Sequence, residues 1–491
     1  MRPIGVPRSP FATAAALLLI AIALRAWDFG NPVIHVDEQY YLLVGDRLLH
    51  GALPYVDIWD RKPIGLFLLY ALIRMLPGDG ILAYQIVATL FAAATAWIVE
   101  RTARRLDAAP VGAFAAAIAY LVWLSLLGGR GGQSPVFYNL FVAIAGSLTL
   151  RLPDLAAARA RGAIVANGLA VCLLCGVAIQ MKYTPAIEGA FFGLVHIWFL
   201  WRAGAGIPAT LAAGIAWILA GLAATLAAIA CYASFGPAAL KLFWFANFTS
   251  IGLRSGYPID QIAMRLLGIV AQLSPLLISA ALTWRARAHT GVRAERASIA
   301  FGWLSAALLG FVAIGTFFDH YALPLIAPLA IIAAPAFSRS LRAMIASLGL
   351  ALTLFVLERA AQPDDASGAR AVARVVAANS GHECPYVFIG DTITYRLANA
   401  CLPTRFAFPN LLAYSTEEGA TGIDEAAEVR RILARRPPVI VTSSRRLTIW
   451  DGESVVIVKA ALARDYRPVF STPRAGYRTV VYLRRDRPFR G

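Results

Sequence analysis

The stretch from Asn31 to Pro63 carries the residues of this chain whose types and spacing could do chemistry. An acidic pair, Asp37 and Glu38, lies near its start, and a basic pair, Arg61 and Lys62, lies near its end. A carboxylate can accept the proton of an attacking hydroxyl while a nearby cation stabilises the charge that develops on a phosphate. This pattern indicates transfer of a group from a phosphate-linked donor.

The same stretch holds other side chains that could contact a sugar ring or an isoprenyl chain. They are Tyr40, Tyr41, Tyr55, Asp57, Trp59 and Asp60. Tyrosine and tryptophan present a large apolar face together with a polar group, which suits stacking on a sugar. A solvated connector is the plain alternative for a charged loop. The adjacent acids and the interleaved aromatic residues favour a binding site.

Three short polar segments elsewhere contain further candidate contacts. Arg130 lies among glycines, where it could bind an anion or simply occupy a flexible turn. Lys182 follows an apolar segment and could hold a phosphate or extend to the lipid headgroups. His320 and Tyr321 lie at the mouth of another apolar segment, where a histidine is more often structural than substrate-binding.

The composition indicates a membrane protein. The chain has 491 residues, of which 59% are hydrophobic and 15% are charged, whereas soluble domains contain about 25% charged residues. The formal net charge is +17, but the arginines form short clusters between apolar segments. Such clusters are typical of orientation signals rather than of a nucleic-acid interface. No nucleic-acid partner is expected.

Apolar segments of near-membrane length recur along the chain, and they predict about eleven transmembrane helices. The predicted spans are 11–27, 81–100, 110–127, 135–150, 163–181, 186–201, 209–233, 263–284, 299–317, 321–337 and 341–357. The first span is expected to be an uncleaved anchor, because no small-residue cleavage site follows it. The shorter apolar segment 64–74 is expected to lie in the membrane interface.

Every second loop between these spans is rich in arginine. The clusters are Arg101, Arg104 and Arg105; Arg151, Arg159 and Arg161; Arg202; Arg285, Arg287, Arg293 and Arg296; Arg339 and Arg342. The positive-inside rule places these loops in the cytoplasm. The loop 28–80 and everything after residue 357 then lie outside the cytoplasm.

The composition changes after the last span, which predicts two domains, 1–358 and 359–491. In the second, strands and helices are expected to alternate at 386–390, 392–400, 425–435, 438–442, 455–462 and 479–483, as in a small α/β domain. Cys384 and Cys401 fall in this part, and their pairing stays open. Cys172 and Cys175 lie in an apolar segment, where helix packing is the expected role.

The loop 28–80 resembles that of the bacterial C-type membrane glycosyltransferases related to the lipid A aminoarabinose transferases and the protein O-mannosyltransferases. Three features carry the resemblance: the acidic pair just outside the first span, the motif L-x-x-G-x-x-P-Y-x-D from Leu48 to Asp57, and the sequence WDRKP that ends at Pro63. The sequence departs from the family at Ile64, where many relatives have a second proline.

The resemblance implies a multispan helical body, interfacial helices in the first outer loop and a small C-terminal periplasmic domain. It further implies an inverting enzyme of the bacterial inner membrane that takes sugars from a polyprenyl phosphate, with its active site on the periplasmic face. Asp37 would be the catalytic base, Glu38 its partner, and Lys62 a contact of the donor phosphate. Metal use varies in this family, so a divalent metal, Mg or Mn, stays open.

The acceptor is left open as a lipid, a glycan or a protein, because the C-terminal part has no recognisable acceptor motif. A nucleotide sugar is a poor donor candidate, since no nucleotide-binding signature is present. The rival functions are a flippase or transporter of lipid-linked sugars and an O-antigen ligase or polymerase. Transporters generally place ionisable residues in mid-span and show internal repeats, whereas here the acids lie in one loop.

Overall fold

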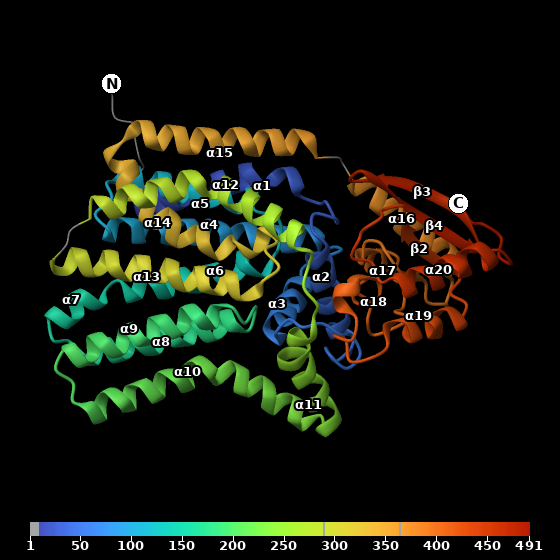
Figure 1. Ribbon diagram of the computed structural model, residues 1–491, viewed down its shortest axis with the longest axis horizontal. Helices are drawn as coiled ribbons and strands as arrows, with labels where there is room; N and C mark the ends of the chain where they lie inside the picture. The colour runs from blue at the N-terminus through green and yellow to red at the C-terminus, as the bar shows by residue number, and fades with distance from the viewer. Residues whose placement is uncertain (1–8, 288–289, 363–364) are drawn as a thin grey trace. The chain divides into compact units, whose positions relative to one another are not determined.

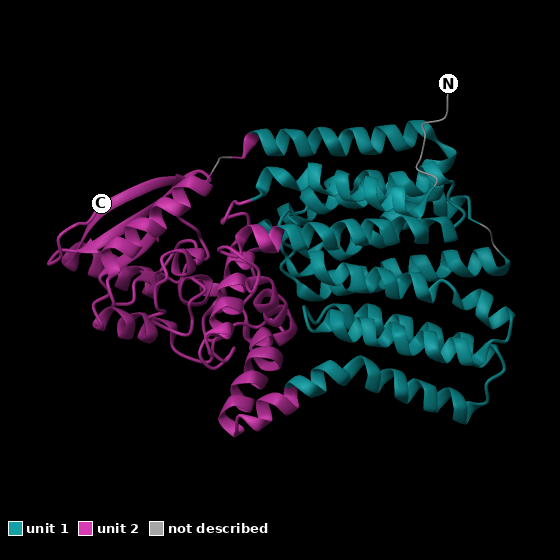
Figure 2. Cartoon of the chain, turned by 180° about the vertical axis from the view of Figure 1, so that it is seen from behind, with its two compact units in different colours: residues 1–29, 86–228, 259–360 teal, residues 30–85, 229–258, 361–491 magenta. Residues whose placement is uncertain are grey.

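The structure is a computed structural model that describes residues 9–287, 290–362 and 365–491. It is mostly helical, with one small sheet (Figure 1). The chain divides into two compact units (Figure 2). Unit 1 comprises residues 1–29, 86–228 and 259–360, and unit 2 comprises 30–85, 229–258 and 361–491. The predicted division into 1–358 and 359–491 stays a prediction.

Unit 1 consists of long apolar helices and the six-residue helix α7. They are α1 (Pro10–Arg25), α4 (Ile81–Arg105), α5 (Pro110–Leu126), α6 (Ser134–Thr149), α7 (Leu152–Ala157), α8 (Arg161–Ile179), α9 (Pro185–Arg202), α10 (Ile207–Ser234), α12 (Ile259–Arg285), α13 (Gly291–Ile314), α14 (Leu323–Arg339) and α15 (Leu341–Ala361). Three of them cross the boundary between the units: α4 belongs to unit 1 from Ile86 onward, α10 up to Ala228 and α15 up to Ala360. Helix α14 packs against α5, α12 and α13 and is buried along most of its length. A helix that is apolar on all sides is expected in such a central place.

Each of the predicted spans overlaps one of these helices, with ends that differ by a few residues in most cases. Among the described residues, eight helices are long and apolar enough to cross a membrane. The other three predicted spans correspond to α5, α9 and α14, which have 17, 18 and 17 residues. Segment 64–74 forms a separate 11-residue helix, and its place in the membrane interface stays a prediction.

Small residues let the helices of unit 1 pack closely. A Cβ added to Gly146 would lie 2.6 Å from the Trp303 ring, and one added to Gly168 would lie 2.4 Å from the Trp217 ring. Small residues commonly allow such close approach between membrane helices. Glycine is therefore needed at these two helix contacts.

The arginine-rich loops of unit 1 meet at one end of its helices. Arg296 pairs with Asp154 at 2.6 Å, Arg293 with Asp107 at 3.3 Å, and Arg202 with Glu295 at 2.5 Å. Loops that are distant in sequence thus exchange ion pairs. This grouping agrees with the predicted alternation of loops, while the side of the membrane on which each end lies stays a prediction.

Unit 2 contains the first loop and the C-terminal part of the chain. Its helices are α2 (Val36–Leu49), α3 (Ile64–Arg74), α11 (Pro237–Trp244), α16 (Ala366–Ser380), α17 (Ile393–Leu397), α18 (Asn410–Ala413), α19 (Glu425–Ala434) and α20 (Gly452–Asp465). Helix α2 packs on α3 at Gly45, where an added Cβ would lie 2.7 Å from the backbone of Tyr70 and Ala71. This glycine therefore sets how closely the two helices approach.

A four-stranded sheet of order β1-β2-β4-β3 completes unit 2. Strands β1 (Tyr386–Val387) and β2 (Val439–Ser443) are parallel, and β4 (Tyr477–Arg484) is antiparallel to both β2 and β3 (Tyr466–Arg474). The small α/β domain is confirmed, but β1 is shorter than predicted and β3 was not predicted. Strand β3 could not be predicted from the sequence pattern, because only its Tyr466 is buried and its apolar residues do not alternate clearly with polar ones.

A disulfide joins Cys384 and Cys401, the pair whose state the sequence left open. Their Cα atoms lie 4.9 Å apart, on either side of β1 and α17. The bond ties the segment that follows Cys401 to the start of β1. Cys172 and Cys175 are free thiols on α8 and are both buried, in keeping with a packing role.

Candidate functional site

The acidic pair lies in the first turn of α2. His35 caps this helix by accepting a hydrogen bond from the backbone N–H of Asp37 at 3.3 Å. Carboxylates are favoured at this position by the helix dipole. Asp37 is half-buried, whereas Glu38 is fully buried. Of the two acids, Asp37 is therefore the one that a substrate can reach.

Asp37 and Lys62 both lie within electrostatic reach of Asp60. Desolvation raises the pKa of the Asp60 carboxyl above its usual value; Lys62 lowers it and Asp37 raises it. The Lys62 ammonium also lies 5.8 Å from the centre of the Tyr41 ring. The structure thus brings together three predicted site residues: two acids and one cation.

Arg61 points to a different set of partners. Its guanidinium pairs with Glu417 at 2.6 Å, and its Nε donates to the Ser250 hydroxyl at 3.0 Å. Arg254 binds the other oxygen of Glu417 at 2.8 Å. Burial lowers the pKa of Arg61, and Glu417 opposes that shift. In this structure Arg61 therefore joins the first loop to two later segments of unit 2.

Tyr55 and Trp59, predicted to contact substrate, are both covered by protein. Tyr55 is 0% exposed, and its ring lies 5.4 Å from the rings of both Tyr232 and Phe243. Trp59 is 1% exposed and lies 5.7 Å from the Phe406 ring. Both residues shape the loop around the site, and their contact with a sugar stays a prediction.

The backbone around Tyr55 is held in an unusual conformation. Its φ of 68° lies in the left-handed region that L-residues seldom occupy. The N–H of Tyr55 donates to the Ile58 carbonyl at 2.7 Å, and its hydroxyl donates to the Lys62 carbonyl at 2.7 Å. Asp57, which is exposed, accepts from the Leu53 N–H at 2.8 Å. These bonds fix the turn that precedes Lys62.

A clamp formed by Gln39, Asp391 and Arg474 holds the segments on both sides of the acidic pair. The Gln39 amide donates to Asp391 at 2.9 Å, and Arg474 forms two hydrogen bonds to Asp391 at 3.1 Å. Arg474 also donates to the Val33 carbonyl at 3.2 Å and pairs with Asp365. Residues distant in sequence thus position the start of α2.

The clamp and Glu417 were not predicted from the sequence. Asp391 follows an expected strand, but an aspartate at that position needs no partner. The pKa of Arg474 is raised, because the charge of Asp391 and its hydrogen bonds outweigh the effect of burial. A strongly held arginine of this kind is recognisable only once the fold places its carboxylates.

Unit 1 brings together three predicted outer segments. The Lys182 ammonium lies 4.0 Å from the centre of the Tyr321 ring, and the rings of His320 and Tyr321 lie 4.4 Å apart. An added Cβ on Gly128 would lie 3.7 Å from the His320 side chain. We call Lys182, His320 and Tyr321 the aromatic–cation cluster.

Arg130 belongs to a neighbouring network of charges in unit 1. It donates to Asp28 at 3.4 Å, and Arg359 donates to both oxygens of the same carboxylate at 3.1 Å. Arg25 donates to the backbone carbonyls of Gly129 and Gly131. The glycine-rich segment thus presents at least two carbonyl groups to a buried arginine, and anion binding by Arg130 stays a prediction.

The predicted site residues therefore fall into two groups, each within one unit. The residues of the first loop lie in unit 2, and Arg130, Lys182, His320 and Tyr321 lie in unit 1. Within residues 9–287, 290–362 and 365–491, no group of three or more His, Cys, Asp or Glu side chains is arranged to hold a metal ion.

Comparison with known proteins identifies the fold. Neither a family model nor a curated protein matches the sequence. Among solved structures, the crystal structure of ArnT from Cupriavidus metallidurans bound to undecaprenyl phosphate matches with a TM-score of 0.64 and 16% sequence identity. The match covers 96% of this chain and 97% of that chain. The chain therefore has the fold of the C-type membrane glycosyltransferases, as the resemblance implied.

Proposed function

We propose that this protein is an inverting glycosyltransferase that moves a sugar from a polyprenyl-phosphate donor to a hydroxyl acceptor. The acceptor belongs to a lipid, a glycan or a protein, and the reaction takes place on the periplasmic face of the bacterial inner membrane. The protein would be a multi-pass component of that membrane, with its C-terminal part in the periplasm.

One observation carries this proposal. Asp37 is half-buried at the start of α2, beside a fully buried Glu38, and both Asp37 and Lys62 lie within electrostatic reach of Asp60. This combination of a reachable carboxylate and a nearby cation occurs in a fold whose solved neighbour was crystallised with undecaprenyl phosphate. A base and a phosphate contact are the two groups that the reaction requires.

In the proposed reaction, the acceptor oxygen attacks the anomeric carbon of the sugar. The acceptor O–H proton passes to the Asp37 carboxylate, a bond forms between the acceptor oxygen and the anomeric carbon, and the bond from that carbon to the phosphate oxygen breaks. Attack from the side opposite the leaving group inverts the anomeric centre. The electron pair leaves with the polyprenyl phosphate, whose charge Lys62 stabilises.

Glu38 and the clamp have supporting roles in this proposal. Glu38 is buried next to the base, so its carboxylate influences Asp37 without touching the acceptor. The clamp restrains the backbone before and after the pair. Restraint of this kind keeps a reacting group in the productive geometry.

Transfer by purified protein in detergent tests the proposal. Radiolabelled polyprenyl-phosphate sugars would be incubated with membrane extracts as acceptor, and the wild type compared with Asp37→Asn. Because a general base contributes about 10²–10⁴-fold, the variant should lose at least about 100-fold in kcat. The matched control is Asp260→Asn, an exposed carboxylate in the first turn of α12 that does not belong to the candidate site.

Wild-type turnover by Asp37→Asn would remove Asp37 from the reaction. If the wild type transfers no sugar from any donor, yet binds lipid-linked sugar as well as the variant does, a flippase or transporter becomes the better assignment. Transfer measured with EDTA, and then with added Mg²⁺ or Mn²⁺, would show whether a divalent metal takes part.

A further inference from the structure

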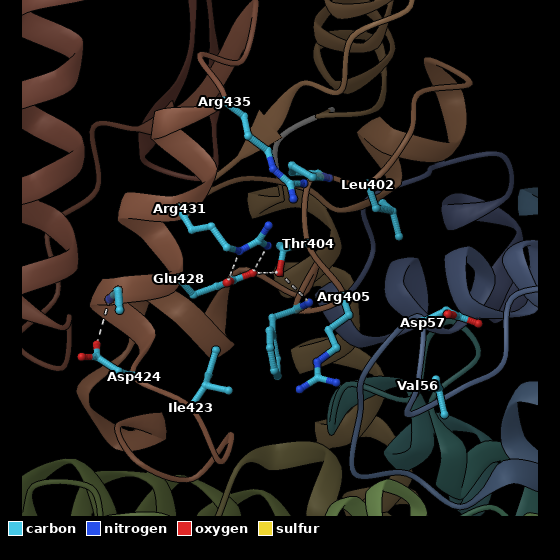
Figure 3. A pocket seen from close by; sticks show the side chains of 13 residues that line it. Val56, Asp57, Leu402, Thr404, Arg405, Ile423, Asp424, Glu428, Arg431 and Arg435 are labelled. Atoms are coloured by element: carbon cyan, nitrogen blue, oxygen red, sulfur yellow. Dashed lines mark hydrogen bonds and ion pairs between the residues drawn. The ribbon is translucent and has the colours of Figure 1, made fainter. Parts of the chain in front are cut away.

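Unit 2 contains an open cavity that the proposed reaction does not use. Its volume is about 660 Å³, and Figure 3 shows the side chains that line it. They come from three segments: residues 56–57 of the first loop, residues 402–406 after the disulfide, and residues 423–435, which include α19. Ligand sites commonly have volumes of about 300–1,000 Å³.

One group of charged residues in the cavity is already paired. Glu428 accepts a hydrogen bond from the Thr404 hydroxyl at 2.5 Å and two from Arg431 at 2.6 and 2.5 Å (Figure 3). Partial burial raises the pKa of Glu428, but these hydrogen bonds outweigh that effect and leave its pKa below the usual value. The charges of Glu428 and Arg431 therefore compensate each other, and the hydrogen-bonded pair forms one wall of the cavity.

Two further arginines line the cavity and form no ion pair with a carboxylate among the described residues, although the charge of Arg405 also helps to lower the pKa of Glu428. Arg405 is half-buried and its guanidinium lies 4.9 Å from the centre of the Phe406 ring. Arg435 is exposed at the end of α19. A guanidinium presents a planar set of donors that matches a phosphate or a carboxylate. The cavity therefore has donors for one anionic group.

The two other acids of the cavity supply acceptors. Asp57 uses one oxygen to accept from the Leu53 N–H, and Asp424 uses one to accept from the Ala427 N–H at 2.8 Å. The second oxygen of each has no partner among the residues that the structure describes. An ionised carboxylate oxygen can accept a hydrogen bond but cannot donate one, so its partner must be a donor such as a hydroxyl. The cavity thus combines donors for an anion with acceptors for hydroxyl groups.

We infer that this cavity binds an acidic saccharide, a sugar that carries a phosphate or a carboxylate group, as part of the acceptor. A saccharide supplies hydroxyls for Asp57 and Asp424, and its anionic group meets Arg405 and Arg435. This inference rests on the proposed function, since that reaction needs a hydroxyl acceptor, and it narrows the acceptor class.

The cavity is joined to the site by the backbone. The N–H of Trp59 donates to the Arg405 carbonyl at 2.9 Å, and Trp59 directly precedes Asp60. The segment that carries Arg405 is also tied at Cys401 by the disulfide. Both connections lie within unit 2. A saccharide in the cavity would therefore rest against the first loop, next to the segment that carries Trp59 and Asp60.

Equilibrium dialysis with the full-length protein in detergent tests this inference. The radiolabelled probes are glucose 1-phosphate, glucuronate and glucose, which differ in the anionic group. Binding of at least one acidic probe should be ten-fold or more tighter than that of glucose. The double variant R405M/R435M should lose this preference. The matched control is Arg430→Met, which lies on α19 and pairs with Glu453 outside the cavity.

The outcomes separate the cavity from the reaction. Preference for glucose 1-phosphate alone would identify a phosphate site, and preference for glucuronate alone a carboxylate site. Equal binding of all three probes, or an unchanged preference in R405M/R435M with an unaltered melting curve, would overturn the inference. The Asp37→Asn protein should bind the probes like the wild type, so loss of transfer with retained binding tests only the proposed function.

Discussion

The two groups of predicted site residues differ in how their charges are held. In unit 2 the charged groups of the first loop are balanced by other charges and hydrogen bonds, as at Asp60, Lys62 and the clamp. In both units a lysine lies near an aromatic ring, but Lys182 of unit 1 lies closer to it, at 4.0 Å from the Tyr321 centre, than Lys62 of unit 2 does, at 5.8 Å from the Tyr41 centre. A carboxylate network suits control of a proton, and a lysine near a bound phosphate can stabilise its charge. The comparison leads us to expect that removal of Lys62 and removal of Lys182 affect sugar transfer in different ways.

Among the variants that test this comparison, Lys62→Met is expected to lower kcat the most. Removing one donor that stabilises a developing negative charge commonly lowers kcat by about 10²–10³-fold. We expect a fall in kcat near the lower end of that range, measured by sugar transfer in detergent. Lys459→Met, an exposed lysine of α20, is the control. An unchanged kcat would remove Lys62 from the reaction.

A smaller effect is expected from Lys182→Met in the aromatic–cation cluster. This variant should raise the KM for the lipid-linked donor by about ten-fold and leave kcat nearly unchanged, because a contact made equally in the ground and transition states affects binding alone. Donor titrations with Lys241→Met, an exposed lysine of α11, provide the control. A fall in kcat with no change in KM would contradict the expected role of Lys182 in donor binding.

The clamp should give a still smaller effect. Gln39→Leu and Asp391→Leu each remove one partner of a 2.9 Å hydrogen bond. The effects of mutating two residues in contact usually differ from additivity by about 0.5–3 kcal/mol. The fall in log kcat of the double variant should therefore be smaller than the sum of the falls in log kcat of the two single variants. The KM for the donor should stay unchanged. Strict additivity of the two losses would show that the clamp does not position the acidic pair.

The smallest expected effect concerns pH and Asp60. Because burial raises the pKa of Asp60 above its usual value of 3.8, the folded protein binds more protons than the unfolded chain between the two pKa values. Stability should therefore fall as the pH rises through this interval. Asp60→Asn should remove that part of the pH dependence and be relatively more stable above the interval.

Unfolding of wild type and Asp60→Asn in detergent, followed at a series of pH values, measures this difference. The control Asp57→Asn, on an exposed carboxylate, should keep the wild-type slope. Parallel curves for wild type and Asp60→Asn would mean that the carboxyl group is not destabilised by burial. Asp60 would then resemble an ordinary exposed acid of the loop.

Local sequence was enough to predict the helices and the region of the candidate site. A run of apolar residues specifies a helix of a certain length by itself. Asp37 and Glu38 are adjacent in the chain, so their common position at a helix start also follows from local features. The α/β character of the C-terminal part was predictable for the same reason, whereas the irregular strand β3 was not.

Only the tertiary structure decided which charges meet. The chain has 45 lysines and arginines and 28 acids, and no local rule selects the pairing of Arg61 with Glu417 or of Arg474 with Asp391. The same holds for the disulfide, which needs two Cα atoms brought close together, and for Lys182 on Tyr321. These contacts join residues that are distant in the chain, so the packing of whole helices and strands determines them, while hydrophobic length and helix capping act locally.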